Sequence, residues 1–158
     1  MPTTKVRQFL DSHHVKYVVI GHSPAYTAQE IASLAHISGK EMAKAVMVKV
    51  DGKMAMAVLP ASYKVDFESL KQGLGAANVE LAHEWEFKHL FPDCEVGAMP
   101  PFGNLYDMPV YVADRLTEDE EIAFNSGTLT ELFSMKYKDF EDLVQPKVIK
   151  FAMAGQAA

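Results

Sequence analysis

The chain has 158 residues, of which 49% are hydrophobic and 23% charged, and its formal net charge is −6 at pH 7. This length and composition fit one domain, residues 1–158, with a substantial core, whereas two domains of this total size would each be marginal. The acidic net charge argues against binding to DNA and against broad nucleic-acid binding. The sequence has no apolar run of ~18 residues and no hydrophobic secretory segment, so we expect no membrane partner and a cytoplasmic protein.

The first part of the chain predicts a helix, a strand and a second helix. Residues 6–10 carry apolar side chains at the i, i+3, i+4 spacing of a short amphipathic helix. Residues 16–20 are β-branched and aromatic enough for a strand that ends at Gly21. Residues 27–30 have the form of a capping box, which predicts a helix from there to about residue 36.

A hairpin follows at the centre of the sequence. Asp51 and Gly52 separate two apolar runs, 45–48 and 54–59, and this pair of residues favours a type I′ turn because both positions need a positive φ. Neither run alternates between apolar and polar residues, so we expect protein on both faces of the hairpin. Lys44 lies at the start of the first strand, at the edge of this apolar hairpin.

The middle of the chain predicts short elements and one shaped loop. We expect a helix over 65–74, with glycines at 73 and 75 as stop signals, and a strand over 78–82. Residues 83–91 are expected to form a helix whose Trp85, Leu90 and Phe91 pack inward. The stretch 95–104 cannot be helical, because two prolines fix φ and remove donors between two glycines.

The last third predicts strands over 109–114, 121–125 and 129–135, with a turn at 126–127, then a helix over 139–144. Residues 148–151 are expected either to add a last strand or to run into the tail. We expect the tail from about 152 to 158 to be mobile. Strands outnumber helices and pair in hairpins. The fold class is therefore α+β, with a mixed, mostly antiparallel curved sheet or partial barrel flanked by helices.

Few residues of the sequence are candidates for metal binding or catalysis. The six histidines show no metal-binding spacing and Cys94 is the only cysteine, so no metal and no cofactor are expected. Two features remain: Lys44, and a loop over 97–104 whose stiff backbone amides suit a carbonyl oxygen that gains charge during acyl transfer. The alternative for Lys44 is an ordinary strand-end lysine that points into water, and the alternative for the loop is a structural turn between strands.

Four motifs in order carry a resemblance. They are His22-Ser23-Pro24 with the capping box 27–30, Lys44 opening an apolar strand, the Gly-x-x-x-Pro loop 97–101, and Asn125-Ser126-Gly127. In this order, over residues 16–146, the chain resembles the YbaK family of freestanding aminoacyl-tRNA deacylases, which is related to the editing domain of bacterial prolyl-tRNA synthetase.

The resemblance implies a function and a site. The implied reaction is hydrolysis of a mischarged aminoacyl-tRNA, in which the terminal ribose hydroxyl of the tRNA orients the water. Its implied partners are the aminoacyl-tRNA acceptor end and, as a further candidate, an aminoacyl-tRNA synthetase. The implied catalytic residues are Lys44, Gly97 and Pro101. The implied substrate-binding residues are His22, Tyr26, Thr27, Met47, Ala98, Met99, Ser126 and Gly127.

Two departures leave the edited amino acid open. Some members have asparagine after the lysine, where this chain has Ala45, and some have histidine after the Ser-Gly turn, where this chain has 128–130 as Thr-Leu-Thr. Two other functions also stay open: a binding module that uses the same cleft without turnover, and a hydrolase of some other small ester.

Overall fold

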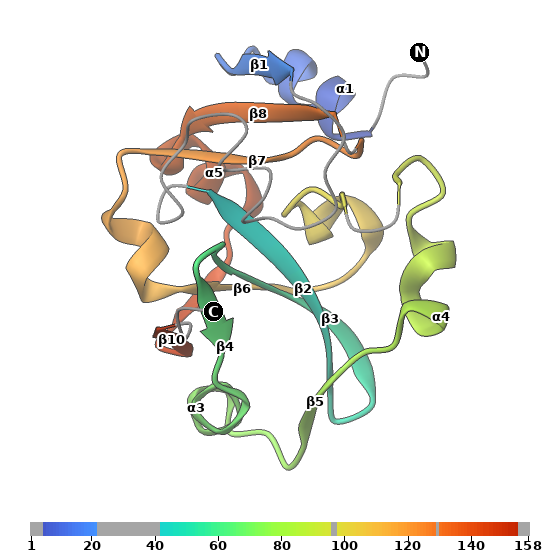
Figure 1. Cartoon of the computed structure of the whole chain (residues 1–158), viewed down its shortest axis with the longest axis vertical. Coiled ribbons are helices and arrows are strands. Elements are labelled where there is room, and N and C mark those ends of the chain that lie inside the picture. Colours follow the sequence, from blue (N-terminus) through green and yellow to red (C-terminus); the bar gives the residue numbers. More distant parts are fainter. Residues whose placement is uncertain (1–4, 22–41, 96–97, 129, 155–158) are drawn as a thin grey trace.

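Figure 1 shows the computed structural model of the chain, which describes residues 5–21, 42–95, 98–128 and 130–154. The helices are α1 (Lys5–Ser12), α3 (Phe67–Leu74), α4 (Glu84–Phe87) and α5 (Tyr137–Val144), with 3-10 turns at Lys88–Leu90, Gly103–Tyr106 and Asp114–Glu118. The strands are β1 (Val18–Gly21), β2 (Ala43–Val50), β3 (Lys53–Pro60), β4 (Tyr63–Val65), β5 (Val79–Leu81), β6 (Val110–Ala113), β7 (Glu121–Asn125), β8 (Glu131–Lys136), β9 (Lys147–Ile149) and β10 (Ala152–Ala154).

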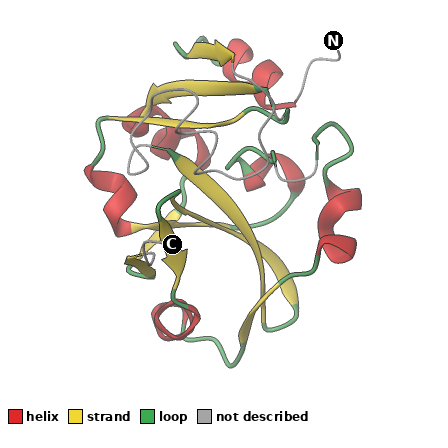
Figure 2. Cartoon of the chain, in the orientation of Figure 1, coloured by secondary structure: helices red, strands yellow, loops and turns green. Residues whose placement is uncertain are grey.

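The strands form three open sheets, with the orders β5-β2-β3-β6-β9, β1-β8-β7 and β10-β4. The β3–β6 and β6–β9 pairs are parallel and the other pairs are antiparallel. Figure 2 shows α1, α3 and α4 at the periphery of these strands. The predicted α+β class, with a mixed and mostly antiparallel sheet, is confirmed. No helix within the described ranges is long and apolar enough to cross a membrane.

The predicted hairpin is confirmed. β2 and β3 pair antiparallel along all eight residues of each strand. Asp51 and Gly52 have φ angles of 50° and 84°, as a type I′ turn requires. The Asp51 carboxylate also accepts hydrogen bonds from the backbone amides of Ala77 and Asn78, at 3.0 and 2.8 Å, so it joins the turn to the segment that enters β5.

Apolar clusters cover both faces of the hairpin, as expected. On one face the hairpin packs against the β1-β8-β7 sheet, α1 and α5. That cluster includes Ala43, Met47, Met56, Val58, Ile122, Phe124, Phe133 and Phe140. On the other face it packs against α3 and the C-terminal strands. That cluster includes Val48, Ala55, Ala57, Leu59, Leu70, Ile149 and Phe151.

The helix predicted over 65–74 begins later and ends where expected. Val65 belongs to β4, and Asp66 caps the helix by accepting from the Ser69 amide at 3.2 Å. Gly75, at φ 64°, ends the helix, whereas the stop signal assigned to Gly73 is wrong. Gly73 lies inside the helix, and a Cβ there would approach Ile149 to 2.5 Å, so this glycine permits close packing.

The helix predicted over 83–91 is shorter than expected. α4 ends at Phe87 and is followed by a 3-10 turn. The inward packing assigned to Trp85 is wrong, because its side chain is 70% exposed. The inward packing of Leu90 and Phe91 is confirmed, since Phe91 is buried and Leu90 is partly buried against the main cluster, and Phe87 is buried as well. Within α4, Trp85 is rotated about the helix axis by about 200° from the buried Phe87 and therefore faces away from the core.

Two further boundaries differ from the sequence predictions. Gly103, expected in an irregular loop, begins a 3-10 turn. The mobile tail expected from residue 152 is wrong for Ala152–Ala154, because these residues form β10 and pair with β4. Residues 155–158 lie outside the described residues, as does the helix predicted over 27–36.

Candidate active site

Lys44 is half-buried on the second residue of β2. Side chains alternate along a strand, so Lys44 shares its face with Val46 and Val48, opposite the fully buried Leu59 of β3. Burial lowers the pKa of the Lys44 ammonium, and the nearby charge of Lys64 lowers it further. No salt bridge joins Lys44 to a carboxylate of the described residues. The arrangement favours an anionic or carbonyl-rich ligand at this ammonium.

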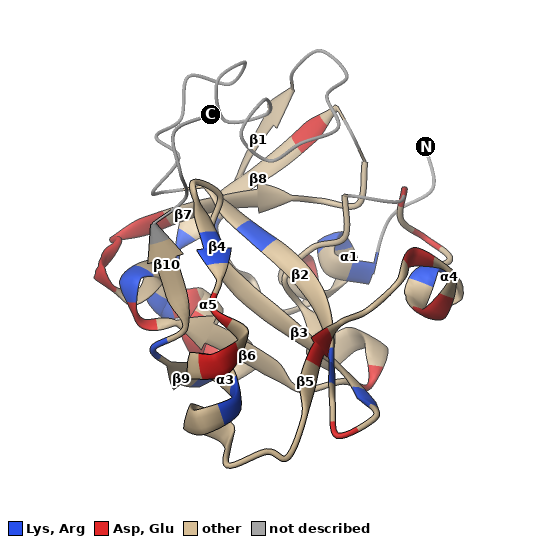
Figure 3. Ribbon diagram, turned by 60° about the horizontal axis from the view of Figure 1, so that its bottom comes forward, with Lys and Arg blue, Asp and Glu red and all other residues tan. Residues whose placement is uncertain are grey.

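The lysines of the hairpin are not gathered around Lys44. Lys49 projects from the opposite face of β2 and pairs with Glu86 at 2.7 Å and Glu80 at 3.3 Å. Lys53 follows the turn at the far end of the strand. Figure 3 shows basic positions on neighbouring parts of β2 and β4, which correspond to the electrostatic contact of Lys44 with Lys64.

The segment containing Pro101 is buried and anchored. Ala98, Pro101, Phe102 and Gly103 are all buried, and Phe102 packs into the main apolar cluster. The Ala98 amide donates to the Glu95 carbonyl at 3.0 Å. These contacts fix the described part of the loop from both ends, which suits a preorganised wall.

The loop and the Ser126–Gly127 turn are brought together. The Glu95 amide donates to the Gly127 carbonyl at 2.7 Å. The Ser126 hydroxyl is buried and donates to the Glu131 carboxylate at 3.0 Å, and Arg7 of α1 pairs with the same carboxylate at 2.7 Å. A network from α1 through β8 therefore holds the turn beside the loop.

One backbone contact places Lys44 near this turn. Met42, two residues before Lys44, forms a parallel bridge with Ala123 of β7, two residues before Asn125. The start of β2 thus lies beside the end of β7. Five buried apolar side chains in this region belong to neither described cluster. They are Met42, Ala61, Ala98, Ala123 and Leu132.

The remaining predicted site residues divide into two groups. Met99 is partly buried against the main cluster, and Met47 is buried within it, on the face of β2 opposite Lys44. The structure therefore does not bring Met47 together with Lys44. The other four predicted residues lie outside the described part of the chain. They are His22, Tyr26, Thr27 and Gly97.

Asn125 is a polar residue of this region to which the sequence assigned no role. It ends β7 directly before the Ser126–Gly127 turn, and only 6% of it is exposed. The available signal was its place directly after the apolar residues 122–124. A buried carboxamide there needs a hydrogen-bond partner.

Within the described ranges, no group of three or more His, Cys, Asp or Glu side chains is arranged to hold a metal ion. A cavity of about 710 Å³ opens beside the hairpin turn, between residues 50–55 and 106–111. This cavity lies at the opposite end of β2 from Lys44. The candidate site rests instead on Lys44, the loop and the Ser126–Gly127 turn.

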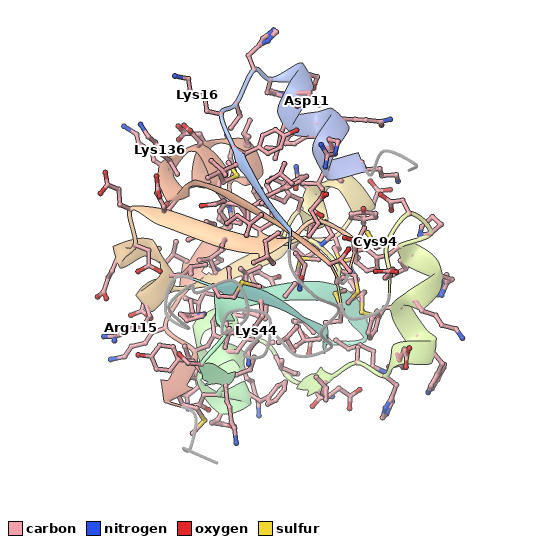
Figure 4. All side chains as sticks on the ribbon, turned by 45° about the horizontal axis from the view of Figure 1, so that its top comes forward. Asp11, Lys16, Lys44, Cys94, Arg115 and Lys136 are labelled. Atoms are coloured by element: carbon pink, nitrogen blue, oxygen red, sulfur yellow. The ribbon has the colours of Figure 1, made fainter. Side chains whose placement is uncertain are left out.

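Cys94 is not placed as a nucleophile. Figure 4 shows it well away from Lys44. Burial raises the pKa of its thiol to about 12, and its sulfur lies 3.4 Å from the Tyr106 hydroxyl and 3.6 Å from the Asp93 carboxylate. A thiol with this pKa holds almost no thiolate at neutral pH.

We therefore expect Cys94→Ala to leave any hydrolytic rate within about threefold of wild type, and the folded protein to react slowly with iodoacetamide at pH 8. Stopped assays and mass spectrometry of the alkylated protein measure the two effects. A rate loss of 10²-fold in a folded variant would contradict the assignment.

The family model for the aminoacyl-tRNA editing domain matches residues 22–143. The multifunctional Ser/Thr-tRNA deacylase ProXp-y of Escherichia coli (strain K12) is 28% identical over 148 residues, which cover 90% of this chain and 87% of that protein. A proline–tRNA ligase of Bacillus mycoides (strain KBAB4) is 31% identical over 86 residues, which cover 54% of this chain and 15% of that protein.

Two solved structures share the fold. The crystal structure of hypothetical protein APE2540 has a TM-score of 0.84 and 20% identity, and the match covers 94% of this chain and 99% of that chain. The structure of a proposed trans-editing enzyme for prolyl tRNA synthetase has a TM-score of 0.78 and 21% identity, over 94% and 95% of the two chains.

The fold and the matched range together define an editing domain. This chain belongs to the aminoacyl-tRNA editing domain family. The resemblance to the YbaK family and to the prolyl-tRNA synthetase editing domain is thereby confirmed.

Proposed function

We propose that this protein is a trans-editing enzyme that hydrolyses the ester bond of a mischarged aminoacyl-tRNA. The observation that carries the proposal is the half-buried ammonium of Lys44, which has no described carboxylate partner and lies on a strand that begins beside β7 and the anchored loop. Family membership and the deacylase named among the relatives support the same reaction.

The proposed chemistry needs no covalent nucleophile. Water attacks the ester carbonyl carbon, the carbonyl oxygen gains charge in a tetrahedral intermediate, and the bond to the terminal ribose oxygen of the tRNA breaks. That oxygen takes a proton, and the products are a free amino acid and uncharged tRNA. In this scheme the ribose hydroxyl next to the ester orients the water, and backbone amides of the 97–101 segment stabilise the oxyanion. Gly97 and Met99 carry the candidate donors, because the Ala98 amide already donates to the Glu95 carbonyl and the two prolines have no amide hydrogen. Lys44 positions the terminal phosphate or carbonyl group.

The partners follow from this reaction. The substrate is the acceptor end of an aminoacyl-tRNA, since a small acidic protein reaches little else of the tRNA. A synthetase is a further proposed partner, because part of the chain is similar to a segment of a proline–tRNA ligase. The ProXp-y relative suggests serine and threonine as the first amino acids to test.

A deacylation panel tests the proposal. One tRNA is charged in turn with serine, threonine, alanine, cysteine, valine and proline, and loss of each ester is followed with and without protein. We expect at least one mischarged tRNA to be hydrolysed well above the uncatalysed rate, with the correctly charged tRNA spared. Uncatalysed rates for every ester would overturn the proposal.

One observation favours a second candidate, a binding module without turnover. Among the described residues, no histidine or carboxylate is recorded in contact with Lys44 as a general base. Filter binding of charged and uncharged tRNA separates the two candidates. Tight retention of charged tRNA, with no ester loss across the panel, would support the module.

A further inference from the structure

The edge of β3 is unpaired at the first residues of the strand. β6 pairs with β3 only from Met56 onwards, which lies opposite Val110. The Met56 amide donates to the Pro109 carbonyl at 3.0 Å, so the backbone groups of Met56 point towards β6. Alternate residues of a paired strand direct their backbone groups to the same side, so Met54 also directs its amide and its carbonyl away from β2. Within the described ranges, no strand pairs with Met54 on that side.

The sequence explains why β6 does not continue along this edge. In a parallel pair each residue bonds to the two residues that flank its partner, so the ladder would reach Met54 through the backbone of residues 107 and 109. Pro109 has no amide hydrogen to donate to the Met54 carbonyl. The amides of Asp107 and Met108 both donate to the Gly103 carbonyl instead, and Asp107, at φ 59°, turns the chain before β6 begins. The segment that faces Met54 therefore offers it no free amide.

The cavity of about 710 Å³ beside the hairpin turn has this part of β3 on its wall. Its apolar lining consists of side chains that belong to the main cluster or pack against it. They are Met54, Leu90 and Met108. Ligand sites in folded proteins commonly have volumes of about 300–1,000 Å³ and an apolar lining with a few polar groups. The cavity therefore has the size and the lining of a binding site, next to a strand edge that needs a hydrogen-bond partner.

The rim of the cavity does not favour a nucleic acid. Its charged residues are Asp51, Lys53 and Asp107, which are all exposed, and two of the three are acidic. Nucleic acids bind to clusters of lysine and arginine that neutralise their phosphate groups, and this rim has no such cluster. A ligand with an apolar side chain and with its own backbone donor and acceptor fits the cavity better.

We propose that this cavity binds an extended peptide segment of a partner protein. The peptide continues the sheet at the place that β6 leaves open. It accepts a hydrogen bond from the Met54 amide, donates one to the Met54 carbonyl, and places an apolar side chain against Leu90 and Met108. Addition of a strand to an open edge takes its affinity from backbone hydrogen bonds and its selectivity from side-chain pockets. The cavity lies at the opposite end of β2 from Lys44, so this binding site goes beyond the deacylase function and does not depend on it.

Nuclear magnetic resonance of the isotope-labelled full chain tests the proposal. The probes are three acetylated tripeptide amides with the sequences Val-Leu-Val, Val-Phe-Val and Thr-Leu-Lys. Each is compared with an analogue that is N-methylated at its central residue and cannot donate there. We expect saturable amide shifts at residues 53–55 and 106–111 with at least one peptide, and about tenfold weaker binding of its analogue, the loss expected for one hydrogen bond. If none of the three peptides shifts these residues at millimolar concentration, the proposal is wrong.

The variant Pro109→Ala supplies the amide that β6 lacks. We expect the new amide at position 109 to donate to the Met54 carbonyl and to be protected from hydrogen exchange, and the variant to bind the tripeptides at least tenfold more weakly than wild type. The control Pro92→Ala makes the same change at an exposed loop position that does not line the cavity, and should bind the peptides like wild type. Unchanged binding in a Pro109→Ala variant whose new amide is protected would overturn the proposal. If that amide is unprotected, the exchange of the Met54 amide decides.

Hydrogen exchange of the Met54 amide gives a readout that needs no variant. In the free protein we expect this amide to exchange at least tenfold faster than the Met56 amide, which is bonded to Pro109, and to become protected when the peptide saturates the site. Equal protection of the two amides in the free protein would show that the edge is already paired, and would contradict the proposal. Shifts of residues 53–55 that grow with protein concentration alone would assign the edge to a second copy of the chain instead of a partner.

Discussion

Replacing Lys44 with alanine is expected to lower kcat/KM for the edited aminoacyl-tRNA by about 10²-fold or more, the usual effect of removing one group that positions or stabilises the reacting centre. The ammonium is half-buried beside Leu59 and Lys64, where burial lowers its pKa. A cation kept in that position without a described carboxylate partner is suited to an anionic ligand. Single-turnover deacylation measures the effect apart from product release.

Two controls make this result specific. Lys64→Ala removes the neighbouring exposed cation of β4 and should change the rate by less than about threefold. Lys44→Met keeps the length of the side chain, should lose activity like Lys44→Ala, and should raise the melting temperature by about 2 °C because a partly desolvated cation is removed. Full activity in either Lys44 variant would remove the lysine from the proposed site.

The sign of the Lys44 pKa shift gives a pH dependence of stability. A lysine whose pKa is lowered in the folded state binds its proton less tightly there than in the unfolded chain. This residue therefore destabilises the fold at neutral pH, and the penalty fades as pH rises from the folded pKa towards the unfolded pKa. Lys44→Met should therefore stabilise the protein relative to wild type more at pH 7 than at pH 10, as urea unfolding at the two pH values measures.

Short sequence patterns correctly predicted those elements whose conformation depends on a few neighbouring residues. The Asp51-Gly52 pair predicted the hairpin because its φ requirement admits few other turns, and the unbroken apolar runs predicted protein on both faces. Trp85 was misplaced because the sequence offers two aromatic residues in α4 on opposite faces, and the core selects Phe87 rather than Trp85. The parallel pairing of β3 with β6 joins distant segments, and no short pattern encodes it.

The sequence allowed candidate site residues to be named, but it did not predict how they are arranged in space. Motif order predicted Lys44, Pro101 and Ser126 as site residues, and that assignment stays a prediction. The Met42–Ala123 bridge, which places the start of β2 beside the end of β7, joins residues 81 positions apart and has no local sequence signal. Asn125 was part of the Asn125-Ser126-Gly127 motif but was not predicted as a site residue. Only its burial and its unpartnered oxygen distinguish it.

Phe102→Leu is expected to lower the deacylation rate about tenfold while Phe140→Leu leaves it nearly unchanged, although both should destabilise the fold by about 1–2 kcal/mol. The two rings are fully buried and lie 5.3 Å apart, centroid to centroid, in one aromatic cluster. Phe102 belongs to the loop that follows Pro101, whereas Phe140 belongs to α5 behind it.

The comparison separates stability from site geometry. A smaller side chain at Phe102 lets the loop shift, and displacement of a catalytic wall by a fraction of an ångström weakens oxyanion stabilisation sharply. At Phe140 the same loss of packing is absorbed within the helix and the core. Urea unfolding establishes that the two variants lose similar stability, and deacylation at 20 °C, where both are folded, gives the rates. Equal rates in the two variants would mean that the loop is a structural turn, and the oxyanion contacts would then have to come from elsewhere in the chain.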